Sequence, residues 1–195
     1  MGSGRSADRR LVIAVGLAAY LLVFPSMVSP VAADNNYFHC GDLFVHHRWN
    51  SATQTYQRPS SWSVTTRGAI DNAAANINSR TQFTWSRLDG GATVAWAALG
   101  NPDPSVAGQA TLTFDQSTCR LVAADLYFNF AHFDAAAHSQ DRKQCTAIHE
   151  FGHGMALAHA ASDTSIMYAD HSFRCHNQLY KVLQPEDEAD LNGLY

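Results

Sequence analysis

Hydrophobic and polar positions alternate in several short segments of this 195-residue chain, a pattern typical of strands with one buried face. The predicted strands cover residues 46–56, 81–88, 93–98, 110–114 and 121–129. Because Asp89-Gly90-Gly91 marks a turn between the second and third segments, these two are predicted to form a strand pair. Residues 115–118 separate the last two strands in the same way.

Helical periodicity predicts a first helix that reaches Asn78 from a cap at Ser63 or Thr65. Its apolar positions are Ile70, Ala73, Ala74 and Ile77. The break at residues 59–61 separates this helix from the strand before it. For these strands and helices together we expect an α+β fold.

Two further helices are predicted in the second half of the chain. Asp141 can cap the first of them, with Gln144 three residues later as a capping-box partner. Its apolar stripe consists of Ile148, Phe151 and Met155. The last helix begins at Pro185, which suits a first helical turn, and residues 186–188 place carboxylates near the positive end of the helix dipole.

The N-terminal segment has the features of a secretory signal peptide covering residues 1–33. Three arginines precede an apolar run at 11–24, and the small residues 31–33 lie just before Asp34. Fourteen helical residues reach about 21 Å, which is short of the roughly 30 Å hydrocarbon core of a bilayer. A membrane span is therefore disfavoured, and an uncleaved N-terminal anchor is the alternative.

The remaining segment, residues 34–195, is predicted to form one domain that is secreted and extracellular. The chain has a net charge of −4. No cluster of Lys and Arg follows Asp34, which argues against nucleic acid or an anionic membrane as the main partner. We expect a monomer that does not bind membranes once the signal segment is removed.

Four cysteines follow the signal segment, and an even number in an oxidising compartment predicts two disulfides. Three pairings are possible. We favour Cys40 with Cys119 and Cys145 with Cys175, because the second bond would tie the second predicted helix to the segment that follows the histidine motif described next. A disulfide is also preferred over the alternative that Cys40 is an inhibitory metal ligand.

Residues 149–159 contain three histidines and a glutamate at the spacing of a catalytic zinc site. His149 and His153 lie one helical turn apart on the same face, so both can reach one ion. His159 would lie off that face in a continuous helix, so the chain must turn after His153. Three ligands leave one tetrahedral position for water, and Glu150 is the candidate general base.

Three motifs together give the chain a resemblance to the metzincin zinc metallopeptidases, and within them to the matrixins. The first is the histidine motif itself, whose family form is HExxHxxGxxH. The second is Met167, which lies eight residues after His159, the offset of the matrixin methionine turn. The third is the C-terminal segment 183–195, which is similar to the terminal helix of matrixins.

The resemblance implies a single metzincin-like domain with a twisted, mostly parallel mixed sheet of about four to five strands. It implies a long helix, a zinc-site helix and a C-terminal helix beside the sheet. His149, His153 and His159 would bind Zn²⁺, Glu150 would be the catalytic base, and Met167 would form a hydrophobic floor below the metal. A protein or peptide substrate would lie along an edge strand above the zinc-site helix.

The sequence departs from the family pattern at several positions. Ala156 stands where the family has a glycine in a left-handed turn, which costs about 1 kcal/mol or more and leaves Asp163 as a substitute third ligand. Ala169 replaces a proline after the methionine. The long inhibitory propeptide of many matrixins is missing. His132, Asp134 and His138 are candidates for a second structural ion, either Ca²⁺ or Zn²⁺.

The leading functional hypothesis is a secreted zinc-dependent metalloendopeptidase with a Glu general base. One alternative is a catalytically inactive secreted binding protein on the same scaffold, motivated by Ala156 and the missing propeptide. Another is a processing enzyme of narrow specificity, which differs from the first only in its range of substrates.

Overall fold

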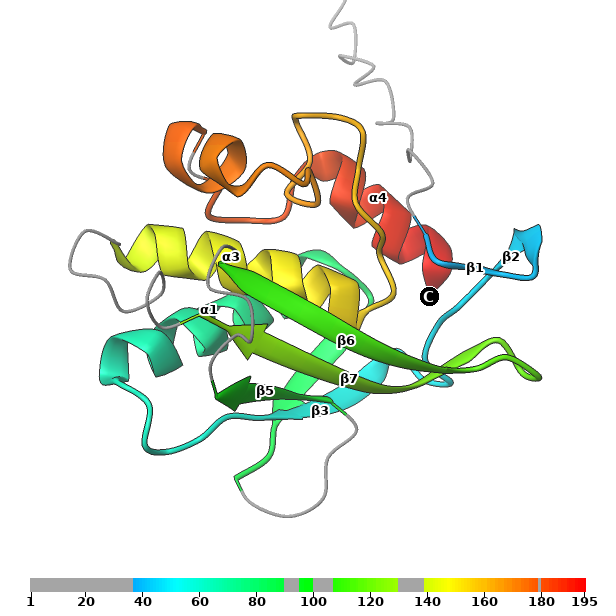
Figure 1. Cartoon of the computed structure of the whole chain (residues 1–195), viewed down its shortest axis with the longest axis horizontal. Coiled ribbons are helices and arrows are strands. Elements are labelled where there is room, and N and C mark those ends of the chain that lie inside the picture. Colours follow the sequence, from blue (N-terminus) through cyan, green and yellow to red (C-terminus); the bar gives the residue numbers. More distant parts are fainter. Residues whose placement is uncertain (1–36, 90–94, 100–106, 130–138, 179) are drawn as a thin grey trace, which may run out of the picture. The chain divides into compact units, whose positions relative to one another are not determined.

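A mixed sheet of five strands, with two helices packed on one face, forms the body of the protein (Figure 1). The computed structural model describes residues 37–89, 95–99, 107–129, 139–178 and 180–195. All of these belong to one compact unit, Val31–Tyr195. The predicted signal segment 1–33 and the candidate ion ligands His132, Asp134 and His138 lie outside the described residues.

The strands of the sheet follow the order β4-β3-β5-β7-β6. Their bounds are Thr53–Gln57 for β3, Thr84–Arg87 for β4, Ala95–Leu99 for β5, Gly108–Asp115 for β6 and Arg120–Phe128 for β7. The first four in this order are parallel, and β6 is antiparallel to β7 and forms one edge. A small separate hairpin consists of β1 (His39–Cys40) and β2 (Asp42–His46).

Helices α1 (Val64–Arg80) and α3 (Gln140–Gly154) pack against each other, and α3 also contacts β6 and β7. Ile70 and Ile77 of α1 and Ile148 of α3 are completely buried. Phe151 of α3 makes edge-on ring contacts with Trp85 on β4, at 5.1 Å between centroids, and with Tyr56 on β3, at 5.3 Å. Each such side chain contributes roughly 1.5–3 kcal/mol through burial.

The chain after α3 covers the side of this helix that faces away from the sheet, as the orange and red segments of Figure 1 show. It contains a short π-helix, Ser172–Asn177, and the terminal helix α4, Pro185–Leu194. A disulfide between Cys145 on α3 and Cys175 in the π-helix joins the two layers. The second disulfide joins Cys40 to Cys119, so both favoured pairings are confirmed.

The α+β class is confirmed, and so are the helices that the periodicity predicted. Ser63 caps α1 by accepting a hydrogen bond from the Thr66 amide, and Pro185 occupies the first turn of α4. The cap predicted for α3 was wrong, because Ser139 rather than Asp141 accepts the hydrogen bond of the first turn. Gln144 is not a capping-box partner, since its amide donates to the Lys181 carbonyl.

Two strand predictions also need correction. The strand predicted at 46–56 is confirmed only in part, since His46 ends β2 and β3 begins at Thr53. Between them Trp49 is buried and donates its indole N–H to the Gly154 carbonyl. The predicted pairing between 81–88 and 93–98 is wrong, because β3 lies between β4 and β5 and is parallel to both. The turn that the sequence predicts between these two segments therefore did not show that they pair with each other.

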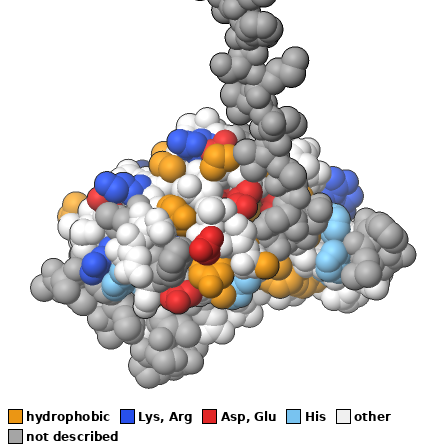
Figure 2. Space-filling model, turned by 90° about the horizontal axis from the view of Figure 1, so that it is seen from above, with side chains coloured by type: hydrophobic (Ala, Val, Ile, Leu, Met, Phe, Trp, Pro, Cys, Tyr) orange, Lys and Arg blue, Asp and Glu red, His pale blue; other side chains and the backbone are white. Residues whose placement is uncertain are grey.

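In the described part of the chain, no helix has the length and apolar character needed to cross a bilayer. On the face shown in Figure 2, the described Lys and Arg side chains are separated by other kinds of side chain. This face therefore offers no continuous basic patch to a polyanion.

One buried carboxylate connects the start of α4 to residues 165–168, the methionine segment around Met167. Asp187 accepts hydrogen bonds from the Ser165 hydroxyl and from the amides of Ile166 and Gln184. Burial raises the pKa of Asp187 to about 6, which leaves it ionised at neutral pH to accept all three donors.

We predict that Asp187→Ala lowers the free energy of unfolding by about 3 kcal/mol, because it leaves three buried donors without an acceptor. Urea unfolding followed by fluorescence measures this change. Glu188→Ala is the control, since Glu188 on the same helix makes a partly exposed ion pair with Arg80 that contributes at most about 1 kcal/mol. Equal losses for the two variants would contradict the anchoring role of Asp187.

Candidate metal centre

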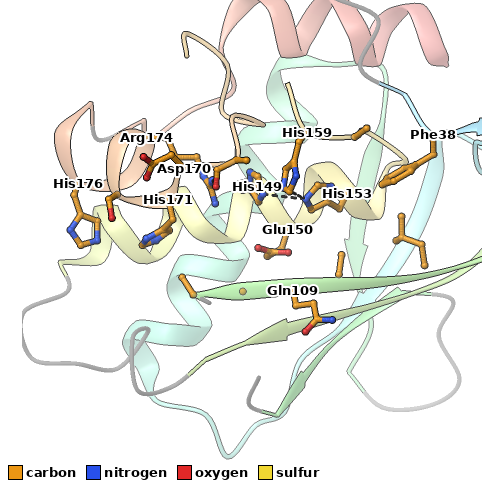
Figure 3. Close-up of a pocket in the computed structure, with 17 residues that line it drawn as sticks. Phe38, Gln109, His149, Glu150, His153, His159, Asp170, His171, Arg174 and His176 are labelled. Atoms are coloured by element: carbon orange, nitrogen blue, oxygen red, sulfur yellow. Dashed lines mark hydrogen bonds between the residues drawn. The ribbon is translucent and has the colours of Figure 1, made fainter. Parts of the chain in front are cut away.

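Helix α3 presents His149 and His153 on the same face, one turn apart (Figure 3). Both are nearly buried, with exposed fractions of 3% and 9%. The opposite face of α3 carries Ile148 and Phe151 into the core, so the apolar stripe fixes the direction in which the two imidazoles point.

The chain turns sharply at the end of α3 and brings His159 back toward the other two histidines. Ala156 has φ 71°, the left-handed conformation that was expected at this position. The turn is held by hydrogen bonds from the Met155 amide to the Phe151 carbonyl and from the Leu157 amide to the Gly152 carbonyl. An alanine thus occupies the strained conformation that glycine adopts more readily.

The three Nε2 atoms converge on one point. His153 Nε2 lies 3.1 Å from His149 Nε2 and 3.2 Å from His159 Nε2. Nitrogen ligands about 2.05 Å from a tetrahedral zinc ion lie about 3.3 Å apart, so these separations fit a zinc site. Among the described residues, these histidines form the one group of three or more potential ligands close enough to share an ion.

Two backbone carbonyls fix which ring nitrogens carry protons. His149 Nδ1 lies 2.8 Å from the Ile166 carbonyl, and His153 Nδ1 lies 2.8 Å from the Leu157 carbonyl. A carbonyl only accepts, so each Nδ1 must donate its N–H, and each neutral ring then directs the Nε2 lone pair at its neighbour. Facing lone pairs at 3.1 Å repel each other unless a cation lies between them, and this donor set therefore fits Zn²⁺.

Burial keeps these imidazoles in the form that binds metals. It lowers the pKa of His153 to about 4 and the pKa of His149 well below its usual range. The more exposed His159 also has a lowered pKa, again mainly because of burial. All three rings are therefore neutral at pH 7, with Nε2 lone pairs available.

Met167 lies directly beneath the α3 segment that carries the histidines. It is 1% exposed, and a Cβ added to Gly152 would overlap its sulfur. The absence of a side chain at Gly152 thus allows the thioether to contact the helix backbone between the two ligands. Because the Ile166 carbonyl orients His149, the methionine segment both supports and aligns the histidine cluster.

Glu150 lies beside the cluster and is not part of it (Figure 3). Its side chain is 2% exposed, and Oε2 has no hydrogen-bond partner in the described part of the protein. Burial raises the pKa of Glu150 to about 8, although the nearby charge of Arg174 acts in the opposite direction. Across the cavity it meets the backbone of Gly108 on β6, where an added Cβ would lie 2.5 Å from Oε1.

The cluster and Glu150 open into a cavity of about 1010 Å³. Strand β6 forms one wall through residues 108–110 and Leu112, and residues 169–172, Arg174 and His176 contribute to the opposite wall. Phe38 lies near His153, with 6.3 Å between ring centroids. The cavity is thus bounded by the edge strand, by the histidines and by the segment that follows them.

The structure brings together the four site residues that the sequence singled out and excludes two alternatives. Asp163 is exposed, does not belong to the histidine group and is not a substitute ligand. Cys40 is in a disulfide and cannot be an inhibitory ligand.

The sequence did not predict the contributions of Gly108, Asp187 and Arg174 to the site. Of these three, only Arg174 could have been noticed in the sequence, because it precedes Cys175, whose disulfide with Cys145 on α3 was predicted.

Comparisons with known proteins add no identification, since no model of a known protein family matches this chain and no curated protein is detectably similar to it. The candidate site must therefore be interpreted from its own geometry.

We predict that Ala156→Val lowers the free energy of unfolding by about 3 kcal/mol and weakens metal binding, because a β-branched residue strongly disfavours φ 71° and the site is fully buried. Ala156→Gly is the matched variant. It should change stability by less than about 1 kcal/mol, because relief of backbone strain is offset by the lost methyl group and by the greater flexibility of unfolded glycine.

Chemical denaturation at saturating zinc, with zinc content measured by elemental analysis, tests both substitutions. If valine were tolerated as well as glycine, the turn that brings His159 to the cluster would not depend on the conformation of residue 156.

Proposed function

We propose that this protein is a secreted zinc-dependent metalloendopeptidase of the matrixin-like metzincin type. The observation that carries the proposal is the convergence of three neutral imidazole Nε2 atoms beside a buried, unpartnered carboxylate in one cavity. A structural zinc site is closed by four protein ligands and does not need a carboxylate beside it, whereas hydrolysis requires a general base next to the metal.

His149, His153 and His159 would hold the ion at the wall of the cavity. A bound zinc ion lowers the pKa of its water ligand to about 7 and polarises the carbonyl of the bond to be cut. The two carbonyl acceptors at Nδ1 keep His149 and His153 in the required tautomer and orientation.

Glu150 would carry the proton during the reaction. Its carboxylate takes a proton from the attacking water, and the resulting carboxyl group donates that proton to the amine nitrogen as the peptide bond breaks. Burial raises the proton affinity of Glu150, and the positive charge of a bound zinc ion would lower it, so these two effects would together set how readily the group takes up and gives back the proton. Gly108 leaves space for the carboxylate beside β6.

The substrate would bind as an extended strand along β6. This strand is an edge of the sheet, and residues 108–110 line the cavity below the histidines. An added strand forms backbone hydrogen bonds that do not depend on the substrate's sequence, and its carbonyl groups are thereby presented at regular intervals. Such binding supports an endopeptidase that acts within extended segments of protein or peptide.

Several features support membership in the matrixin-like group. The sheet is mixed and mostly parallel, the residue at the family's glycine position is left-handed, and Met167 lies under the ligand helix. The two disulfides support export to an oxidising compartment.

A catalytically inactive binding protein on the same scaffold is the rival proposal. It was motivated by Ala156, yet the turn accommodates this residue with His159 in the cluster. Zinc content does not separate the two proposals, whereas proteolysis that stops on addition of a chelator does. A processing enzyme of narrow specificity would differ by cutting few members of a peptide library.

We predict that Glu150→Ala lowers kcat/KM on an unfolded protein substrate by about 10²–10⁴-fold while one zinc ion per chain is retained, because it removes the base and no ligand. His149→Ala should instead lose the metal. Activity assays combined with elemental analysis distinguish these results. Undiminished turnover by metal-replete Glu150→Ala protein would refute the assignment of the base.

We predict that Gly108→Ala lowers kcat/KM by about 10–100-fold with little change in zinc content or melting temperature, because the new Cβ occupies the position of the Glu150 carboxylate. Gly68→Ala is the control, since the nearest atom to its added Cβ is 3.4 Å away and Gly68 is not in the cavity wall. Steady-state kinetics with both variants tests this; equal activity would show that Glu150 acts from another position.

A further inference from the structure

A buried arginine contributes to the cavity wall beside the histidine cluster. Arg174 lies in the π-helix, is 3% exposed, and lines the same cavity as His149 and Glu150 (Figure 3). The proposed hydrolysis does not use it. Its neighbour Cys175 is bonded to Cys145 of α3, so the arginine has a fixed position relative to the ligand helix.

The guanidinium group is only partly satisfied by the protein. Nη1 donates to the carbonyls of Tyr168 and Ala169, but Nε has no hydrogen-bond partner among the described residues. In the described structure no carboxylate makes an ion pair with Arg174. Glu150 and Asp170 are the acidic groups whose charge acts on it, and Asp170 is exposed.

A buried positive charge in this position would be stabilised by an anionic partner that forms hydrogen bonds with it. Burial lowers the pKa of Arg174 only to about 10, so it remains positive at neutral pH. A buried charge without a counter-ion is strongly destabilising, and arginine binds carboxylates through two parallel hydrogen bonds when both groups are accessible. The Tyr168 and Ala169 carbonyls accept hydrogen bonds from Nη1 and fix the position of the side chain, but they do not neutralise its charge.

We propose that Arg174 binds a carboxylate of the substrate, so that the enzyme prefers peptides with an acidic group beside the bond that is cut. This inference rests on the proposed peptidase function. The carboxylate can belong to an Asp or Glu side chain or to the C-terminus of a short peptide, since both present the same group. Arg174 is thus a specificity-determining residue, and Glu150 remains the base.

The test compares peptides that are cut at the same bond and differ only in charge. Cleavage-site mapping on a peptide library first identifies the flanking position that is enriched in acidic residues. Matched peptides with Glu or Gln, and with Asp or Asn, at that position are then assayed, together with versions that end there in a free carboxylate or an amide. We expect kcat/KM to be at least about tenfold higher for the acidic member of a pair.

Arg174→Gln should remove this preference and bring the Glu-to-Gln ratio of kcat/KM close to one, whatever its effect on the absolute rate with either peptide. Arg174→Lys keeps the charge and should retain part of the preference. Arg87→Gln is the control, because Arg87 lies on β4 outside the cavity and should leave the ratio unchanged. Melting temperature and zinc content verify that each variant is folded.

Calorimetry with zinc-loaded Glu150→Gln protein measures the affinity for each peptide and does not depend on cleavage. Tighter binding of acidic peptides, lost on adding Arg174→Gln, supports the proposal. If neutral and acidic peptides are cut and bound equally, the proposal is wrong although the peptidase function stands. If nothing is cut, the peptidase proposal fails, and the binding measurement alone decides whether Arg174 selects carboxylates.

Discussion

Two hydrogen bonds from imidazole Nδ1 to backbone carbonyls set the geometry of the histidine cluster. They fix the protons of His149 and His153 and direct both Nε2 lone pairs at the point that His159 also reaches. One carbonyl belongs to Leu157 in the turn after the helix, and the other belongs to Ile166 in the methionine segment. The ligand geometry therefore depends on two segments outside the helix that carries the histidines.

The rest of the structure holds these two segments in place. The left-handed residue at 156 completes the turn, while Asp187 on α4 binds the methionine segment through three donors. Helix α4 thus contributes to the orientation of the His149 ring. The histidine motif and the terminal helix are physically linked in this way, although residues 160–182 separate them.

Most of the elements and the four central site residues could be predicted from the sequence, because both depend on short spacings along one helix or strand. Features that depend on partners distant in the sequence could not be predicted in this way. Alternation identifies the buried face of a strand but not its neighbour, so the position of β3 between β4 and β5 was missed. For the same reason the contacts of Gly108, Asp187 and Arg174 could not be foreseen.

The disulfide between Cys145 and Cys175 has a consequence for the shape of the cavity. It attaches the wall that carries Arg174 to the helix that carries the histidines, so a covalent bond joins two sides of the cavity that are distant in the sequence. Both cysteines are completely buried, and the two sides cannot move apart without breaking this bond.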